Sequence, residues 1–188
     1  YAANKNYSLE IKLASLLHDV GKPRAKRGEG PDSTFYGHEV VGARMTAKIL
    51  ERLRFSKKII EKVVKLVRCH LFYYDTEEVT DSSIRRLIQK VSPENIYDLV
   101  KVREADRIGS GVPKAVPYRL RHFLYRVEKV MKEPAVSLRH LQIDGNDVLE
   151  ILKIKPGPKV GMILNAVFEE VLDDPKKNEK EYLLKRVK

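Results

Sequence analysis

The sequence predicts an all-α fold in which a helical bundle is followed by a smaller helical region. Apolar residues recur at three- and four-residue spacing through most of the 188 residues, as they do in amphipathic helices. No stretch shows the apolar–polar alternation of a half-buried strand, and breaks that contain Gly or Pro separate the apolar stripes. Because 43% of the residues are hydrophobic, the chain can build a core and global disorder is not expected.

The first 108 residues contain apolar stripes of helical spacing, bounded by capping or breaking residues. We expect helices at 9–20, 37–53, 57–71, 81–91 and 93–108. Residues suited to N-capping precede the last three of these: Ser56, Thr80 and Ser92. Gly21 and Pro23 end the first stripe. The charged residues, glycines and proline of 24–36 then predict a loop.

The segment Gly-Ser-Gly at 109–111, followed by two prolines, is the strongest internal boundary in the sequence. We therefore predict a first domain at 1–108 and a second helical region at 109–188. Within the second region, helical patterns lie at 118–132, around 146–149 and at 159–172.

Composition excludes several classes of protein. A single cysteine, Cys69, cannot form an internal disulfide or a thiolate-rich zinc site. No apolar run reaches the length of a membrane helix and no signal peptide is visible, so we expect a cytoplasmic protein without membrane contact. The net charge of +11 favours a polyanionic partner, although lysine-rich surfaces also occur on thermostable proteins.

Several residues with metal-ligating chemistry lie at or near the ends of the expected helices. They are His18, Asp19, His38, His70 and Asp106. In a helical bundle such residues can converge on one cavity and supply nitrogen and oxygen ligands to a divalent metal. For each histidine taken alone, a capping or hydrogen-bonded structural role is the better explanation, and only the set read together favours a metal site.

Read together, these residues resemble the HD superfamily of metal-dependent phosphohydrolases. The resemblance rests on the segment LLHDVGKP at 16–23, a later histidine and a distal aspartate, and it covers residues 8–108. It implies one or two divalent ions (magnesium, manganese, nickel, iron or zinc) held by His18, Asp19, His38, His70 and Asp106, with Asp19 able to bridge two ions. The family also has a metal-binding histidine upstream of this segment, and no histidine precedes His18 here.

The same resemblance implies a hydrolytic reaction on a phosphate ester. Divalent ions polarise a phosphoryl oxygen and activate water, with Asp19 at the reacting centre. Lys22 would neutralise a non-bridging phosphate oxygen, or it is an ordinary cation at a helix C-terminus. Arg68 and Arg107 are weaker candidates of the same kind as Lys22.

Further segments resemble bacterial tRNA nucleotidyltransferases, the CCA-adding or poly(A) polymerase-type enzymes with a C-terminal HD domain. These segments are YGHE at 36–39, DGND at 144–147 and KPGPKVG at 155–161, and the likeness extends over nearly the whole chain. The chain lacks a Gly-Ser segment followed by paired aspartates for nucleotide addition. We therefore expect it to be a C-terminal fragment whose nucleotidyltransferase domain lies upstream, and which does not add nucleotides by itself.

The resemblance gives the basic C-terminal half a function in binding tRNA. Residues 112–132 include six Lys or Arg residues and only one acidic residue, and two tyrosines lie among them. The predicted RNA contacts are Lys114, Arg119, Arg121, Arg126, Lys155, Gly157 and Lys159. A solvated helix face and a helix-breaking Pro-Gly-Pro turn are the alternative explanations.

The sequence is therefore compatible with three functions. The first is a tRNA-binding body with a metal-dependent site for phosphate esters or 2′,3′-cyclic phosphates. The second is an RNA-binding body whose HD residues are catalytically silent. The third is a stand-alone HD nucleotidase with small nucleotides as substrates. tRNA binding separates the third from the others, and metal-dependent turnover separates the first from the second.

Overall fold

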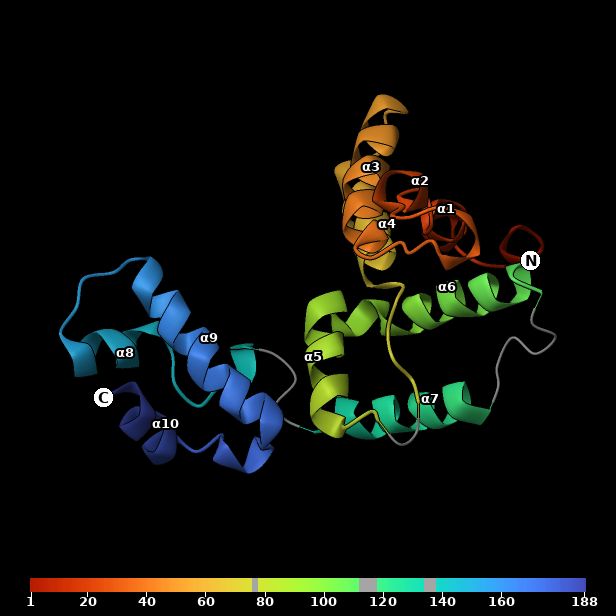
Figure 1. Cartoon of the computed structure of the whole chain (residues 1–188). Coiled ribbons are helices and arrows are strands. Elements are labelled where there is room, and N and C mark those ends of the chain that lie inside the picture. Colours follow the sequence, from red (N-terminus) through yellow and green to blue (C-terminus); the bar gives the residue numbers. More distant parts are fainter. Residues whose placement is uncertain (76–77, 112–117, 134–137) are drawn as a thin grey trace. The chain divides into compact units, whose positions relative to one another are not determined.

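The computed structural model describes residues 1–75, 78–111, 118–133 and 138–188. These residues are mainly helical and form no β-strand, so the all-α prediction is confirmed (Figure 1). An isolated antiparallel bridge joins Arg27 to Thr34 in the loop before the third helix. None of the helices in the described segments is both long and apolar enough to cross a bilayer.

The α-helices are α1 Leu9–Leu17, α2 Lys22–Ala25, α3 His38–Arg52, α4 Lys57–Cys69, α5 Asp81–Val91, α6 Ile96–Gly109, α7 Tyr118–Met131, α8 Gly145–Leu152, α9 Pro158–Asp173 and α10 Lys180–Val187. Short 3₁₀ turns lie at Ala2–Asn4, Gly30–Asp32, Pro93–Asn95, Leu138–His140 and Pro175–Lys177.

The chain divides into two compact units. The first contains residues 1–74 and 90–121, and the second contains residues 75–89 and 122–188. The first unit therefore holds α1 to α4 and α6, whereas the second holds α8 to α10 with most of α5 and α7. The functional division predicted at residue 108 stays a prediction.

The core of the first unit lies among α1, α3, α4 and α6. Helix α3 packs along α4, and α1 lies against both α4 and α6. The side chains that fill this core are fully or almost fully buried: Ile11, Ala14, Leu50, Val63, Leu66, Val67, Leu99 and Val102. Their burial fixes where α1 ends relative to the start of α3, the end of α4 and the last turn of α6.

Helices α8, α9 and α10 enclose the core of the second unit. Its buried members include Val148, Phe168, Leu172 and Leu183. Asp144 begins α8 with a capping box, because its side chain accepts from the backbone N–H of Asp147, whose carboxylate accepts from the Asp144 N–H. This local device explains why the DGND segment begins a helix.

The N-cap predicted at Ser56 is confirmed, and the one predicted at Ser92 is wrong. The Ser56 hydroxyl accepts a hydrogen bond from the Ile59 backbone N–H. Ser92 instead has a positive φ of 74°, makes no capping hydrogen bond, and accepts a hydrogen bond from the Lys65 ammonium through its hydroxyl. A tertiary contact to α4 has therefore replaced the local cap.

The predicted loop at 24–36 begins later than expected, because Pro23 lies in the first turn of the short helix α2. Proline is tolerated there, since the N–H groups of a first turn have no intrahelical partner. Lys22 therefore begins a helix instead of ending one.

Gly21 allows the turn after α1 to approach α3 closely. A methyl group at Gly21 would lie 2.2 Å from the His38 carbonyl oxygen and 2.6 Å from the Gly42 nitrogen, both backbone atoms. We expect Gly21→Ala to lower the free energy of unfolding by about 1–3 kcal/mol, measured by denaturant titration. Gly161→Ala is the control, since nothing lies within 4 Å of that position. Equal stability of the Gly21 variant and the wild type would contradict this close packing.

Candidate metal centre

Four helix ends of the first unit bring the predicted metal ligands together. His18 and Asp19 follow directly after α1, and His38 is the first residue of α3. His70 follows the last residue of α4, and Asp106 lies in the last turn of α6. Residues separated by as many as 88 positions in the sequence thus come together at one site, as can happen in a helical bundle.

The three histidines share one orientation. Each ring Nδ1 lies within hydrogen-bond distance of the carbonyl oxygen three residues earlier: His18 to Ser15 at 2.8 Å, His38 to Phe35 at 2.7 Å and His70 to Val67 at 2.7 Å. Because a carbonyl oxygen only accepts, each Nδ1 carries the proton and donates it. In the neutral ring, the lone pair of Nε2 is then free to bind a cation. Metal-binding histidines typically donate their other ring N–H to a carbonyl or carboxylate oxygen in this way.

The first cluster of ligand atoms is formed by Asp19, His38 and His70. The two Nε2 atoms of His38 and His70 lie 3.3 Å apart. Asp19 Oδ1 lies 3.2 Å from His38 Nε2 and 3.7 Å from His70 Nε2. Electron-rich atoms at these distances repel one another unless a proton or a metal ion lies among them.

The second cluster is formed by His18, Asp19 and Asp106. His18 Nε2 lies 3.2 Å from Asp19 Oδ2 and 3.3 Å from Asp106 Oδ1. These are ion-pair distances, yet the directions do not meet the requirement for a hydrogen bond, so this buried nitrogen has no hydrogen-bond partner. Asp19 therefore contributes one carboxylate oxygen to each cluster.

The electrostatics of the centre keep its carboxylates charged. Burial opposes protonation of His18, but the adjacent carboxylates of Asp106 and Asp19 outweigh it and raise the pKa of His18 to about 10. Burial would raise the pKa of Asp19, yet His18 and Lys22 together hold that pKa well below its usual range. His18 likewise lowers the pKa of Asp106, and burial lowers the pKa of His70. A metal binds to ionised Asp and to neutral His, so a divalent ion at this centre would have to displace the Nε2 proton of His18.

The donor set fits a divalent ion. It combines imidazole nitrogens with carboxylate oxygens, and the ligand atoms of each cluster lie within 4.8 Å of one another. Mixed nitrogen and oxygen ligands of this kind are compatible with manganese, iron, nickel and zinc, and the carboxylates with magnesium. One shared carboxylate between two clusters is the arrangement expected where two ions bind side by side.

Lys22 and a hollow of the surface adjoin the centre. The Lys22 ammonium lies 2.5 Å from Asp19 Oδ2, so it already neutralises one oxygen of this carboxylate. A cavity of about 560 Å³ is lined by His18, Asp19 and Asp106 together with residues of the N-terminal segment. The second cluster is therefore reachable from the surface.

Arg103 was not predicted from the sequence. Its guanidinium lies 2.7 Å from Asp106 Oδ2, whereas Asp106 Oδ1 faces His18. The i,i+3 spacing on α6 is the signal that identifies this pair. Arg103 therefore orients the carboxylate of Asp106 toward the cluster.

The predicted RNA-binding residues of α7 differ in their surroundings. Arg119 and Arg121 are exposed near the start of α7, and Lys114 lies outside the described residues. Arg126 is mostly buried, and its guanidinium contacts the Asp81 carboxylate at 2.5 Å and the Val79 carbonyl oxygen. Much of the hydrogen-bonding capacity of Arg126 is thus used inside its own unit.

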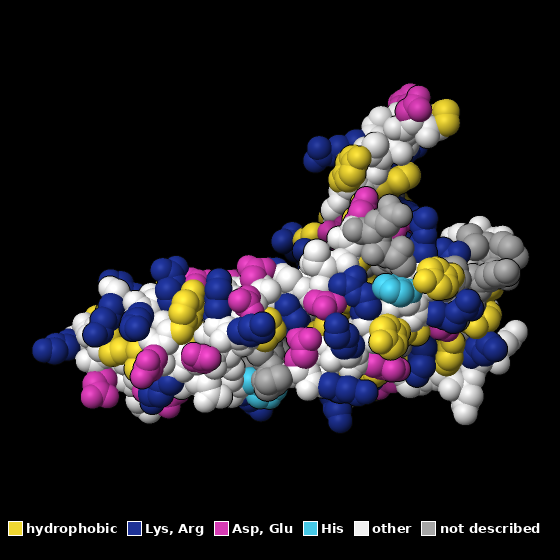
Figure 2. Space-filling view, turned by 90° about the horizontal axis from the view of Figure 1, so that it is seen from below, with side chains coloured by type: hydrophobic (Ala, Val, Ile, Leu, Met, Phe, Trp, Pro, Cys, Tyr) yellow, Lys and Arg dark blue, Asp and Glu magenta, His cyan; other side chains and the backbone are white. Residues whose placement is uncertain are grey.

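The turn before α9 is exposed, and Lys155, Gly157 and Lys159 all lie on it or directly after it. Figure 2 shows Lys and Arg side chains interspersed with acidic and hydrophobic side chains over the visible face. The positive charge on that face is therefore distributed rather than gathered in one patch.

The sequence matches the profile of tRNA nucleotidyltransferase domain 2 over residues 40–187. The match begins after His18, Asp19 and His38, and it includes His70 and Asp106. No solved structure matches the chain significantly.

Relatives of known name support the same family. The chain is 36% identical over 163 residues to the CC-adding tRNA nucleotidyltransferase of Thermus thermophilus and 32% identical over 168 residues to the A-adding tRNA nucleotidyltransferase of Deinococcus radiodurans. It is 24% identical over 155 residues to the multifunctional CCA protein of Acinetobacter baumannii. These matches cover 80–86% of the chain and only 36–37% of each relative. The chain belongs to the tRNA nucleotidyltransferase family, and it corresponds to about a third of the length of these relatives.

Proposed function

We propose that the chain is the HD-type body of a tRNA nucleotidyltransferase, which binds tRNA and carries a divalent-metal phosphohydrolase site. The site would act on phosphate esters or 2′,3′-cyclic phosphates. The observation that supports this most strongly is the convergence of three histidine Nε2 atoms on the shared carboxylate of Asp19. Nδ1 donors held by backbone carbonyls and a carboxylate that faces both clusters support a metal-binding role.

A divalent ion bound here would polarise a phosphoryl oxygen and lower the pKa of a water molecule. The protein residues would hold the ion in place, because the backbone carbonyls orient the imidazoles and Arg103 orients Asp106. Asp19 presents one oxygen to each cluster, and Lys22 supplies a positive charge at the edge of the centre, where a phosphate oxygen would lie. Hydrolysis of 2′,3′-cyclic AMP with added manganese, nickel or magnesium tests the proposal. No turnover with any divalent metal would contradict it.

Binding of tRNA is proposed from the relatives, whose names describe tRNA nucleotidyltransferases, and from the exposed basic residues. Lys155 and Lys159 flank the turn before α9, where the backbone N–H groups of a helix N-terminus favour a phosphate. In the parent protein a nucleotidyltransferase domain would lie upstream of this chain. The chain itself would hold the tRNA body.

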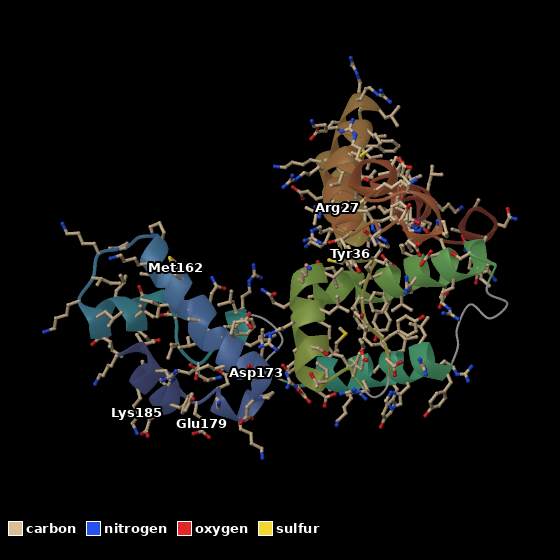
Figure 3. The ribbon with its side chains drawn as sticks, in the orientation of Figure 1. Arg27, Tyr36, Met162, Asp173, Glu179 and Lys185 are labelled. Atoms are coloured by element: carbon tan, nitrogen blue, oxygen red, sulfur yellow. The ribbon has the colours of Figure 1, made fainter. Side chains whose placement is uncertain are left out.

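We expect the double variant Lys155→Gln and Lys159→Gln to bind tRNA more weakly. Each lost phosphate contact should reduce the slope of log affinity against log salt by roughly 0.9. Electrophoretic mobility shifts at several salt concentrations measure this slope. Lys185→Gln is the control, because Lys185 is exposed on α10 and lies apart from Met162, which marks the early part of α9 (Figure 3). Equal slopes for the double variant and the control would contradict the assignment of this turn.

A catalytically silent tRNA-binding body is the second candidate. It is favoured by the family match, which begins at residue 40 and therefore excludes the HD pair. In that case the chain would bind tRNA and would show no metal-dependent turnover. Metal-dependent turnover of small nucleotides without any tRNA binding would instead indicate a stand-alone nucleotidase.

A further inference from the structure

Two hollows of the first unit join on the side of the centre where His38 lies. The first, of about 590 Å³, is lined by Lys22, Tyr36, His38, Arg68 and Lys90 among others. The second, of about 410 Å³, is lined by residues of α4 that include Lys65, together with Arg68 and Lys90 again. Both hollows are lined by Arg68 and Lys90, so they adjoin at these two side chains and together make one surface. We call it the α4 groove, defined by Lys22, Tyr36, Lys65, Arg68 and Lys90.

The α4 groove carries more positive than negative charge. Its cations are Lys22, Lys65, Arg68 and Lys90, and its carboxylates are Glu39 and Glu61. Lys22 is already paired with Asp19 of the metal centre at 2.5 Å. Lys65 and Arg68 lie three residues apart on α4 and so face the same way.

The cations of the groove are only partly neutralised. Arg68 Nη1 lies 3.1 Å from Glu39 Oε1, which leaves other donors of the guanidinium for a ligand. The Lys65 ammonium donates to the neutral Ser92 hydroxyl at 2.7 Å. Lys90 is exposed and makes no ion pair with any residue in the described segments. A polyanion would therefore meet uncompensated charge along the groove.

An exposed aromatic ring lies at the end of the groove next to the metal centre. Tyr36 is 81% exposed and precedes His38 by two residues. Tyr36 follows Thr34 by two residues, and the bridge between Thr34 and Arg27 closes the loop before it (Figure 3 labels Arg27 and Tyr36). An exposed ring of this kind offers a surface on which a nucleic-acid base can stack.

We propose that the α4 groove binds the sugar–phosphate backbone of a single RNA strand, whose terminal phosphate reaches the His38 end of the metal centre. The placement of the strand end rests on the proposed phosphohydrolase function, whereas strand binding does not. Several cations together with an exposed aromatic ring favour nucleic acid over an acidic peptide, which would use the charges but not the ring. The natural substrate would then be an RNA end rather than a free mononucleotide.

Fluorescence anisotropy with 5′-fluorescein-labelled octauridylate tests this proposal without any need for turnover. We expect Lys90→Gln to reduce the slope of log affinity against log salt by roughly 0.7, the value for one phosphate contact in a single strand. Tyr36→Leu should weaken binding about fivefold or more through the loss of base stacking. Both side chains are exposed, so neither variant threatens the fold. Lys48→Gln on α3 is the charge-matched control, because Lys48 is exposed and lines neither hollow.

Competition experiments distinguish an RNA strand from a mononucleotide and from an acidic peptide. Unlabelled octauridylate should displace the probe better than uridine monophosphate at equal phosphate concentration, because a strand engages several cations at once. Polyglutamate should displace it poorly.

Equal binding by Lys90→Gln, Tyr36→Leu and Lys48→Gln would overturn the proposal, as would equal displacement by the mononucleotide or by polyglutamate. Asp19 does not belong to the groove, so failure of the hydrolase proposal and failure of the groove proposal give different results. An inactive centre with intact strand binding contradicts only the former.

Discussion

Replacing Asp19 with asparagine should abolish the proposed phosphohydrolase activity, with a loss of more than about 100-fold in turnover at saturating metal. Asp19 is the only residue among those described that contributes to both ligand clusters, with Oδ1 toward His38 and His70 and Oδ2 toward His18. An amide keeps the shape of the carboxylate but removes the charge and one acceptor oxygen. Both clusters should therefore fail together, which no substitution of one histidine would achieve.

The activity of Asp19→Asn is best measured with 2′,3′-cyclic AMP and each candidate metal in turn. Asp32→Asn is the matched control, because Asp32 is exposed in the loop before α3 and belongs to neither cluster. The control should keep wild-type turnover. Retained turnover in Asp19→Asn would show that the hydrolytic centre lies elsewhere.

Replacing Arg85 with methionine should destabilise the second unit by about 3–5 kcal/mol. The Arg85 side chain is 6% exposed, and its guanidinium contacts Glu133 at 2.7 Å and the Leu172 carbonyl oxygen at 2.7 Å. A third hydrogen bond reaches the Asp173 carbonyl oxygen at 3.3 Å. Methionine keeps the packing of the stem but leaves the half-buried Glu133 carboxylate and the Leu172 and Asp173 carbonyl oxygens without their donor.

The neighbouring Arg86 provides the control for this experiment. Its guanidinium pairs with Glu169 and Asp173, yet the side chain is 40% exposed, so solvent screens both ion pairs. Arg86→Met should cost less than about 1 kcal/mol. Thermal and denaturant unfolding followed by circular dichroism compare the two variants. Equal losses would contradict the structural role that burial gives to Arg85.

Local signals in the sequence were sufficient for most of the helices. The apolar stripes predicted α3, α4, α5 and α7 to within about two residues at each end, because one face of each helix is buried. The structure brings His18, Asp19, His38, His70 and Asp106 together at helix ends of the first unit. The roles of the individual ligands stay a prediction, since they came from the family resemblance and not from spacing.

Features that depend on tertiary contacts could not be read from the sequence. Arg85 resembles any exposed helix cation until α9 supplies the Leu172 carbonyl oxygen, 87 residues away. Ser92 resembles an N-cap until Lys65 of α4 takes its hydroxyl. Lys90 enters the α4 groove from a different helix than Arg68, and no periodic pattern links residues on separate elements.

The metal content of the chain tests the central claim most directly. Elemental analysis after dialysis against each divalent metal, performed on the wild type and on Asp19→Asn, measures the ions retained per chain. We predict about one or two ions in the wild type and none above background in the variant, because Asp19 joins the two clusters. Equal metal content in both proteins, or no specific metal in the wild type, would contradict a metal centre built from His18, Asp19, His38, His70 and Asp106.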